Sequence, residues 1–432
     1  MTVKTNTAPP RGMRDLLPVE VALRDRASAA IQANFEAFGF ARIETPALEH
    51  IALLCSGQGG DNEKLIYKVL KRGRKLDVAA ASHEDEVVDF GLRFDLTVPL
   101  ARFYAQNQGQ LLQPFKSIQI GPVWRAERPQ KGRYRQFTQC DIDVLGEAGP
   151  LAEIELIAAT AQSLGALGLN DIALRINDRQ LLSAMVAHCG FDADAEGRVF
   201  VSLDKLDKIG AGGVTAELTE QGHGPAAIAA LMSLMADRQS GLPALAAALG
   251  DGDERTAPAI ERLSTILGAF PGGLPGGGTL SFDPTLVRGM GYYTGSIFEI
   301  GLEGLPFSIA GGGRYDGMIG SMQGRDVPAC GFSIGFERVL LVLAERGWQR
   351  SRGASRVALL HDGGDPATLL AMAQAMREGG SSVSLFARRK NTARQLQELR
   401  EAGYTGYARA ASGAASGDLP AVQSLAPSSA EG

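Results

Sequence analysis

Positive charge is concentrated between Arg125 and Gln139, where four arginines and one lysine occur in fifteen residues of a chain with a formal net charge of −5. Alternate side chains of a strand point the same way, which places on one face Arg133, Arg135, Phe137, Gln139, Asp141 and Asp143. Arginine forks pair with phosphate oxygens, an aromatic ring stacks on a base, and carboxylates hold ammonium or imidazolium groups. This combination favours a nucleotide site over the alternative, a solvated outer face of a sheet.

The bulk composition is that of a globular protein: 432 residues, 45% hydrophobic and 21% charged, which suggests roughly two or three domains. No apolar run approaches the ~18 to 20 residues that cross a bilayer, and the N-terminus lacks the apolar core of a secretory signal. The cysteines form no CxxC pair and lie far apart, at Cys55, Cys140, Cys189 and Cys330. We therefore expect a cytoplasmic protein without a disulfide framework, a zinc site or membrane association.

The order of predicted strands and helices indicates an α+β fold, an antiparallel sheet core flanked by helices. We expect residues 1–170 and 279–350 to form this core, and the Ala- and Leu-rich residues 171–278 to form a helical insertion that ends in a Gly/Pro joint. Residues 355–410 show a βαβα pattern, typical of a small C-terminal α/β module. The remainder, 411–432, is rich in Ala, Ser, Gly and Pro and is expected to be disordered.

Several longer segments occur in a recognisable order: RGMRDLLP, GFARIETPALE, WRAERPQKGRYRQFTQCDIDVLG, LVRGMGYYTGSIFEI, AGGGRYDGMIG and GFSIGFERVLLVL. Over about residues 11–350 they resemble the N-terminal signature, motifs 1, 2 and 3, and the two histidine signatures of one family. That family is the histidyl-tRNA synthetases, within the class II aminoacyl-tRNA synthetases. The resemblance implies a class II catalytic core and a homodimer, because motif 1, here with Pro46, pairs across the family's twofold axis.

For ATP, the resemblance implies a site formed by Arg125, Glu127, Arg133, Phe137 and Arg338. Arg125 would bind the α-phosphate, Phe137 would stack on adenine, and Arg338 would bind the γ-phosphate. Glu127 would face adenine or the metal-bound phosphates. ATP is then a substrate with Mg²⁺, and no zinc, no organic prosthetic group and no metal held confidently by protein side chains is expected.

For L-histidine, the resemblance implies a pocket formed by Asp95, Thr97, Gln139, Asp143, Arg288, Tyr292, Tyr293 and Tyr315. Arg288 and Arg125 would act as the catalytic pair, offsetting negative charge on the α-phosphate during attack by the histidine carboxylate. Gln130 and Lys131, in the loop between the two predicted strands, would contact the acceptor end of the tRNA for histidine.

The sequence departs from the family at two places. Gly291 stands where the family commonly has Asp, and the module after residue 355 resembles only the start of the family's anticodon-binding domain. The predicted function is histidine activation by ATP followed by transfer to tRNA. One alternative is the non-catalytic paralogue, a regulatory subunit of ATP phosphoribosyltransferase, which typically loses the ATP-binding arginines. Another is an enzyme that activates histidine for a product other than charged tRNA.

Overall fold

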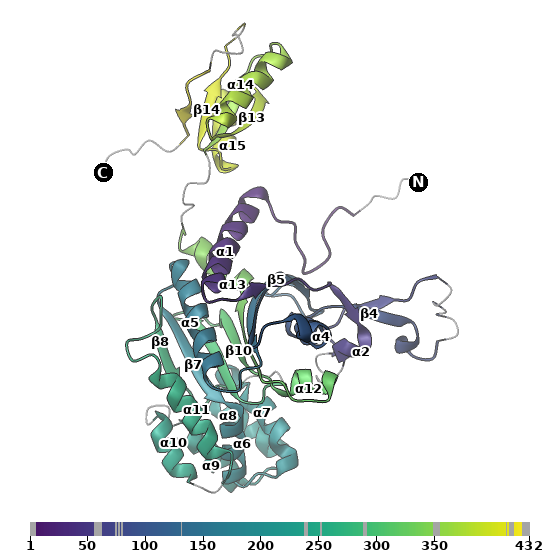
Figure 1. Ribbon diagram of the computed structural model, residues 1–432, viewed down its shortest axis with the longest axis vertical. Coiled ribbons are helices and arrows are strands. Elements are labelled where there is room, and N and C mark those ends of the chain that lie inside the picture. The colour runs from purple at the N-terminus through teal and green to yellow at the C-terminus, as the bar shows by residue number, and fades with distance from the viewer. Residues whose placement is uncertain are drawn as a thin grey trace. The chain divides into compact units, whose positions relative to one another are not determined.

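The structure is a computed structural model that describes residues 6–55, 63–73, 76, 78, 81–130, 132–236, 241–250, 253–287, 292–348, 355–411, 413 and 419–425. Two compact units share the chain: Met1–Arg14 with Arg26–Arg346, and Asp15–Asp25 with Gly347–Gly432. The helix α1 (Pro18–Ala37) begins in one unit and ends in the other. Each unit has its own sheet or sheets (Figure 1).

The main sheet has eight strands in the order β1-β5-β6-β11-β10-β9-β7-β8; Figure 1 labels β5, β7, β8 and β10 among them. Their bounds are β1 (Ala41–Arg42), β5 (Phe115–Trp124), β6 (Gln136–Leu145), β7 (Ile172–Asp178), β8 (Thr279–Phe282), β9 (Ser296–Leu302), β10 (Ala310–Arg314) and β11 (Ala329–Gly335). From β5 to β7 every neighbouring pair is antiparallel, so the predicted antiparallel core is confirmed. The two edge pairs, β1 with β5 and β7 with β8, are parallel.

Strands β5 and β6 form a hairpin of this sheet, in register from Phe115 opposite Leu145 to Trp124 opposite Gln136. Alternation along β6 places Ile142 and Val144 on an apolar face and Asp141 and Asp143 on the other. All four are almost completely buried. A solvated outer face is therefore excluded for β6, because its polar side chains are enclosed by protein.

A smaller sheet has the strand order β2-β4-β3. After its strand β4 the chain forms a helix, α4, which borders the cavity described below. The elements are β2 (Leu48–His50), α2 (Ile51–Cys55), β3 (Lys68–Leu70), β4 (Val88–Leu92) and α4 (Thr97–Asn107). Between β4 and α4 lies Asp95, whose Oδ1 accepts a 3.1 Å hydrogen bond from the backbone amide of Val98. This bond satisfies one of the amides that the first turn of a helix leaves without an intrahelical acceptor, and it fixes Asp95 beside Thr97.

Helices cover and extend the main sheet. Against β6 and β11 pack α5 (Leu151–Ala166) and α13 (Phe336–Glu345), while α12 (Gly317–Gln323) packs against α4. A separate group of helices follows β7 in the chain (Figure 1): α6 (Arg179–His188), α7 (Glu196–Leu203), α8 (Leu206–Glu220), α9 (Pro225–Ala236), α10 (Gly241–Leu249) and α11 (Thr256–Gly268).

The start of the predicted helical insertion differs in the structure. Residues 172–178 form β7, a strand of the main sheet, paired with β8 and β9. Its alternate residues Ile172, Leu174 and Ile176 are buried, as a strand pattern requires. The helices begin only at Arg179, after Asp178 accepts a 2.8 Å hydrogen bond from the amide of Gln180 and caps α6.

The C-terminal unit contains a four-stranded sheet in the order β13-β12-β14-β15. Its elements are β12 (Arg356–His361), α14 (Pro366–Glu378), β13 (Ser382–Ala387), α15 (Thr392–Glu401), β14 (Gly406–Arg409) and β15 (Gln423–Ser424). The α/β character of this module is confirmed: β12 is parallel to β13 and β14. Within the segment predicted to be disordered, however, β15 pairs antiparallel with β14.

No helix in the described part of the chain combines the length and the apolar composition needed to span a bilayer.

Candidate active site

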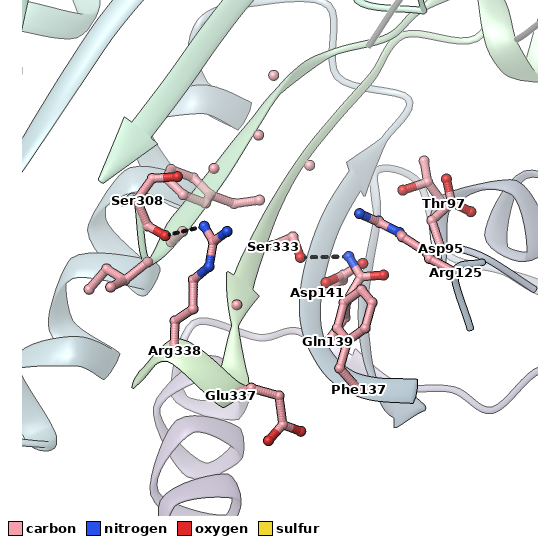
Figure 2. A pocket seen from close by; sticks show the side chains of 18 of the residues that line it. Asp95, Thr97, Arg125, Phe137, Gln139, Asp141, Ser308, Ser333, Glu337 and Arg338 are labelled. Atoms are coloured by element: carbon pink, nitrogen blue, oxygen red, sulfur yellow. Dashed lines mark hydrogen bonds between the residues drawn. The ribbon is translucent and has the colours of Figure 1, made fainter. Parts of the chain in front are cut away.

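A cavity of about 330 Å³ lies on the polar face of the main sheet. Strands β6, β10 and β11 contribute to its lining, as do the beginnings of α4 and α13 and the segment after β5. From the predicted site residues it brings together Asp95, Thr97, Arg125, Glu127, Arg133, Phe137, Gln139, Asp143, Tyr292, Tyr293, Tyr315 and Arg338. Side chains separated by more than 200 positions in the sequence thus line one space (Figure 2).

Asp95 and Asp143 are buried carboxyls with unused hydrogen-bonding capacity. Asp143 Oδ1 accepts a 2.6 Å hydrogen bond from the Tyr315 hydroxyl. Asp95 Oδ2 and Asp143 Oδ2 have no hydrogen-bond partner in the described part of the chain. Burial raises the pKa of Asp95 to about 6 and that of Asp143 to about 7. A bound cation would restore ionisation of both, because an opposite charge nearby favours the carboxylate.

A third carboxyl, Asp141, lies two residues before Asp143 on the same strand and is equally buried. Burial, followed by repulsion from Asp143, raises its pKa well above the usual range. Its Oδ1 also lacks a partner among the described residues. The cavity therefore concentrates acidic groups that are only partly compensated by protein.

Strand β11 approaches this acidic cluster closely. A Cβ atom added to Gly331 would lie 2.0 Å from Asp143 Oδ1, so no larger residue fits without moving the carboxyl. Two positions along, Ser333 Oγ accepts a 2.9 Å hydrogen bond from Gln139 Nε2 (Figure 2). These contacts fix the side chains of β6 against β11.

Tyrosine rings form a further wall. Tyr292 contacts Tyr293 at a centroid distance of 4.8 Å and Tyr315 at 6.0 Å, both edge to face. Such pairs favour this geometry because the edge of one ring is positive and the face of the other is negative. The rings thus form a rigid aromatic side of the pocket next to Asp143.

Arg125 lies beside Asp95 and Thr97 in Figure 2. Its Nε donates a 2.9 Å hydrogen bond to the Phe94 carbonyl. Its guanidinium carbon is 5.1 Å from the centroid of the Phe137 ring. One edge of the guanidinium is thereby fixed by protein, and the terminal nitrogens border the cavity, as binding of an anion requires.

A second cationic group, Arg338 in the first turn of α13, lies on the opposite side of Ser333 from Arg125 (Figure 2). Its Nη1 donates a 2.7 Å hydrogen bond to the Ser308 carbonyl, and its guanidinium carbon is 5.3 Å from the Phe307 ring centroid. The two arginines can therefore contact an extended anion at separate points.

Glu127 and Arg133 form an ion pair at the cavity edge. Burial opposes ionisation of Glu127, but the hydrogen bond and positive charge of Arg133 outweigh it and hold the pKa of this carboxyl below its usual range. Glu127 is therefore a carboxylate at neutral pH, available to a metal ion or an amino group.

Some predicted residues are not part of the described cavity. Arg288, Gly291 and Lys131 lie outside the described residues. Gln130 does not line the cavity; its amide and carbonyl pair with those of Arg133 at 3.1 and 2.9 Å, which closes the turn of the hairpin.

The structure also adds residues that the sequence analysis did not assign to the site: Ser308, Ser333, Glu337 and Asp141. Asp141 was expected on the same strand face as Gln139 and Asp143, but no role was assigned to it. The others face the cavity only because β10, β11 and α13 fold beside β6, which local patterns do not reveal.

In chemical terms, the cavity offers arginines for phosphate oxygens and carboxyls for a cationic amino acid. Within the described ranges, no three His, Cys, Asp or Glu side chains gather as a metal-binding set. An antiparallel sheet with such a cavity defines a class II aminoacyl-tRNA synthetase.

Comparisons with known proteins identify the family. The profile described as histidyl-tRNA synthetase matches residues 12–339. The histidine–tRNA ligase of Leifsonia xyli subsp. xyli is 51% identical over 420 residues, covering 93% of this chain and 94% of the relative. The chain belongs to the histidyl-tRNA synthetase family, and the enzyme class predicted from its motifs is confirmed.

Solved structures agree with this assignment. The histidyl-tRNA synthetase of Nostoc sp. PCC 7120 is 27% identical with a TM-score of 0.76, over 94% of this chain and 92% of that one. A Bacillus halodurans C protein described as an ATP phosphoribosyltransferase regulatory subunit/histidyl-tRNA synthetase has a TM-score of 0.73 at 20% identity, over 93% of this chain and 97% of that one. The likeness to the Bacillus halodurans C protein concerns the fold alone.

Proposed function

We propose that the cavity binds ATP and L-histidine together, forms histidyl-adenylate, and passes the histidyl group to the tRNA for histidine. The observation that carries this proposal is the presence of Arg125 and Arg338 in the same cavity as Asp95 and Asp143. The two arginines suit the phosphates of a nucleotide, and the two aspartates suit the positive groups of an amino acid.

At the amino-acid end, Asp95 and Thr97 bind the α-ammonium group of histidine. Asp143, held by Tyr315, accepts a hydrogen bond from the imidazole, and Gln139, Tyr292 and Tyr293 enclose the substrate. Selectivity follows because a buried polar site strongly rejects an analogue that leaves its groups unpaired. The free oxygens of Asp95 and Asp143 are consistent with these roles.

At the nucleotide end, Phe137 stacks on adenine, Arg125 binds the α-phosphate and Arg338 the γ-phosphate. Mg²⁺ enters with ATP, since it prefers substrate phosphates plus one or two carboxylates and several waters. The ionised Glu127, paired with Arg133, fits this requirement as a protein oxygen donor near the phosphates.

Activation then needs only positioning and charge. A histidine carboxylate oxygen forms a bond to the α-phosphorus while the bond to the pyrophosphate oxygen breaks, and that electron pair leaves with pyrophosphate. Arg125 and Arg288 offset the negative charge that builds up on the α-phosphate oxygens. No protein nucleophile or base is required for this step.

In the second step, a terminal ribose hydroxyl of the tRNA forms a bond to the acyl carbon while the bond from that carbon to the phosphate oxygen breaks. AMP leaves with that electron pair, and the hydroxyl proton passes to a phosphate oxygen of the departing AMP. We assign contacts with the acceptor end to Gln130, in the turn of the hairpin, and to Lys131. Residues 355–410 would contribute further tRNA binding, as a short form of the family's anticodon-binding module.

We also propose a cytoplasmic homodimer, on the basis of the motif 1 segment around Pro46. Its catalytic core would comprise residues 1–170 and 279–350 together with strand β7 (Ile172–Asp178), and the helices from Arg179 onward would be an insertion. The regulatory-subunit alternative is not proposed: the Leifsonia xyli relative at 51% identity is a histidine–tRNA ligase, and Arg125 and Arg338 both border the cavity.

Histidine-dependent exchange of labelled pyrophosphate into ATP tests the first step with purified protein. Histidine should support rapid exchange and each other standard amino acid only background exchange. Charging of a tRNA-histidine transcript with labelled histidine tests the second step, with a transcript for another amino acid as the control. Exchange without charging would favour an acceptor other than tRNA, and no exchange at all would remove the proposal.

A further inference from the structure

We propose that residues 11–14, called here the N-terminal clamp, position the ATP-binding hairpin of residues 125–135. Gly12 and Arg14 are positioning residues: they touch the hairpin and its neighbours rather than the substrate. The inference rests on the proposed function, because it concerns how the same cavity binds ATP.

Backbone hydrogen bonds connect the N-terminal clamp to Arg135. The amide of Arg135 donates a 2.8 Å bond to the Gly12 carbonyl, and Arg135 Nη1 donates a 3.4 Å bond to the Arg11 carbonyl. Arg135 also forms hydrogen bonds with two hairpin residues of the ATP site, Glu127 and Arg125. Its Nε donates to the Glu127 carbonyl at 3.0 Å, and its carbonyl accepts from the Arg125 amide at 2.8 Å. The position of the clamp is thereby transmitted to two residues of the ATP site.

Gly12 packs against the hairpin too closely for any side chain. It has a φ of +83°, and an added Cβ would lie 2.7 Å from Pro129 Cγ and 2.9 Å from Arg135 Cδ. Real Cβ atoms essentially never approach so closely, so a substitution must displace Pro129, Arg135 or the clamp itself. Any of these shifts changes the placement of Glu127.

Arg14 links the hairpin to α13. Its guanidinium carbon lies 4.9 Å from the centroid of the Tyr134 ring, a cation–π distance. Its Nη2 is 3.6 Å from Glu337 Oε2. Glu337 Oε1 in turn accepts a 3.2 Å hydrogen bond from the Thr138 amide of β6. Tyr134 and Glu337 both line the cavity, and Glu337 precedes Arg338 in the chain.

The contacts given above for Gly12 and Arg14 lie at the nucleotide end of the cavity. They reach Arg135, Tyr134 and Glu337, and the hairpin itself carries Arg125, Glu127 and Arg133. Disturbing the clamp should therefore weaken ATP binding and leave histidine binding largely intact. A loss of folding would not produce this separation.

Gly12→Ala is the first test, with Gly39→Ala as its matched control. Gly39 has a similar φ of +79°, but nothing lies within 4 Å of an added Cβ. Both variants carry the same backbone strain, and only the first collides with the hairpin. We expect Gly12→Ala to raise the KM for ATP in pyrophosphate exchange by roughly tenfold, since misplacement of about 1 Å can cost up to about 10²-fold. The KM for histidine should change less than about twofold, and Gly39→Ala should resemble the parent.

Arg14→Ala provides an independent test that does not strain the backbone. It should raise the KM for ATP in the same direction, and Arg14→Lys should recover part of the loss because it keeps the charge beside Glu337 but not the planar contact with Tyr134. Arg346→Ala is the control, since Arg346 pairs with Asp171 on the surface at 2.7 Å. Melting temperatures of all variants show whether each is folded.

Direct titration with ATP in the absence of histidine separates the two proposals. Weaker ATP binding by Gly12→Ala than by Gly39→Ala supports the clamp, even if the parent shows no histidine-dependent exchange, a result that would overturn only the proposed function. Equal ATP binding and equal KM values in Gly12→Ala, Arg14→Ala and their folded controls would overturn the clamp and leave the proposed function standing.

Discussion

Three aspartates line the cavity, at positions 95, 141 and 143, and each is at most 3% exposed. Their burial raises all three pKa values, with Asp143 at about 7. Taking ionised carboxyls out of water is unfavourable unless they are paired. Simultaneous ionisation of these three carboxyls is therefore unfavourable, and a cationic substrate would favour it, which links substrate binding to protonation.

Asp143→Asn tests this link. A carboxyl whose pKa is raised on folding stabilises the protein below its unfolded pKa and loses that contribution as pH rises through the folded value. The pKa of Asp143 in the folded protein is about 7, against 3.8 for an exposed aspartate. At pH 8 the variant should thus melt no lower than the parent, because it lacks the buried charge. Its KM for histidine should nevertheless rise by about 10²-fold or more, since the amide cannot supply the charge.

Histidine binding by the parent should depend on pH in the opposite direction, because it needs the Asp143 carboxylate whose burial is unfavourable. As pH falls from 8 to 7, protonation of Asp143 should raise the KM for histidine, whereas the KM of Asp143→Asn should change less, because Asp95 has a pKa of about 6. Asp362→Asn, at an exposed carboxylate paired with Arg388, is the control and should follow the parent. A variant that loses stability and activity together at pH 8 would indicate that Asp143 is structural.

At the scale of elements, hairpin β5–β6 shows what sequence could predict. Both of its strands alternate and their pairing is local in sequence, so Gln139, Asp141 and Asp143 were expected on one face, and all three line the cavity. Arg135, expected on the same face, precedes β6 and does not line the cavity. Strand β7 shows what could not be predicted. The alternation of Ile172, Leu174 and Ile176 is compatible with a strand, but the segment is short and its partner β9 begins more than 100 residues later, so nothing local shows which sheet it joins.

The candidate site divides in the same way. Residues on one strand, such as Phe137, Gln139 and Asp143, follow from period-two alternation alone. Asp95, Tyr315 and Arg338 were assigned through resemblance, because nothing local in their segments points to a shared cavity. Ser333 and Glu337 needed the structure, since their roles depend on β11 and α13 lying beside β6.

A buried ion pair connects two of these elements. Arg314, at the end of β10, donates from Nε and Nη2 to the two Glu153 oxygens of α5, each at 2.7 Å, and Glu153 is fully buried. Tyr315, which binds Asp143, is the next residue. Arg314→Met should destabilise the chain by about 3 to 5 kcal/mol, because it leaves Glu153 as a buried unpaired charge.

Chemical unfolding monitored by circular dichroism measures this effect. The double variant Arg314→Met, Glu153→Met should recover most of the loss, because an apolar replacement of the whole pair is often neutral. Arg346→Met, at the exposed pair with Asp171, should change the free energy of unfolding by less than about 1 kcal/mol. A single variant as stable as that control would show that the Arg314–Glu153 pair contributes little.

At the scale of the whole molecule, the described cavity belongs to one unit only. Every residue that lines it falls within Arg26–Arg346, while the C-terminal unit has hydrophobic clusters of its own on its sheet. A unit with its own core can be removed without opening the other core. The two steps of the proposed reaction should therefore respond differently to deletion of the C-terminal unit.

Deletion of residues 347–432 should leave histidine-dependent pyrophosphate exchange within about threefold of the full chain, because the groups that bind ATP and histidine all remain. Charging of tRNA should fall by about 10²-fold in kcat/KM, which corresponds to losing roughly 3 kcal/mol of tRNA binding at 1.4 kcal/mol per factor of ten. Most of the loss should appear in the KM for tRNA, since the acceptor end would still reach the cavity at high concentration.

A chain shortened only by residues 426–432 serves as the control and should charge normally. If the long deletion charges tRNA as well as the full chain does, recognition resides in the catalytic unit and in the acceptor end of the tRNA. If exchange is lost as well, the C-terminal unit supports the fold of the catalytic unit, and the proposed separation of the two functions is wrong.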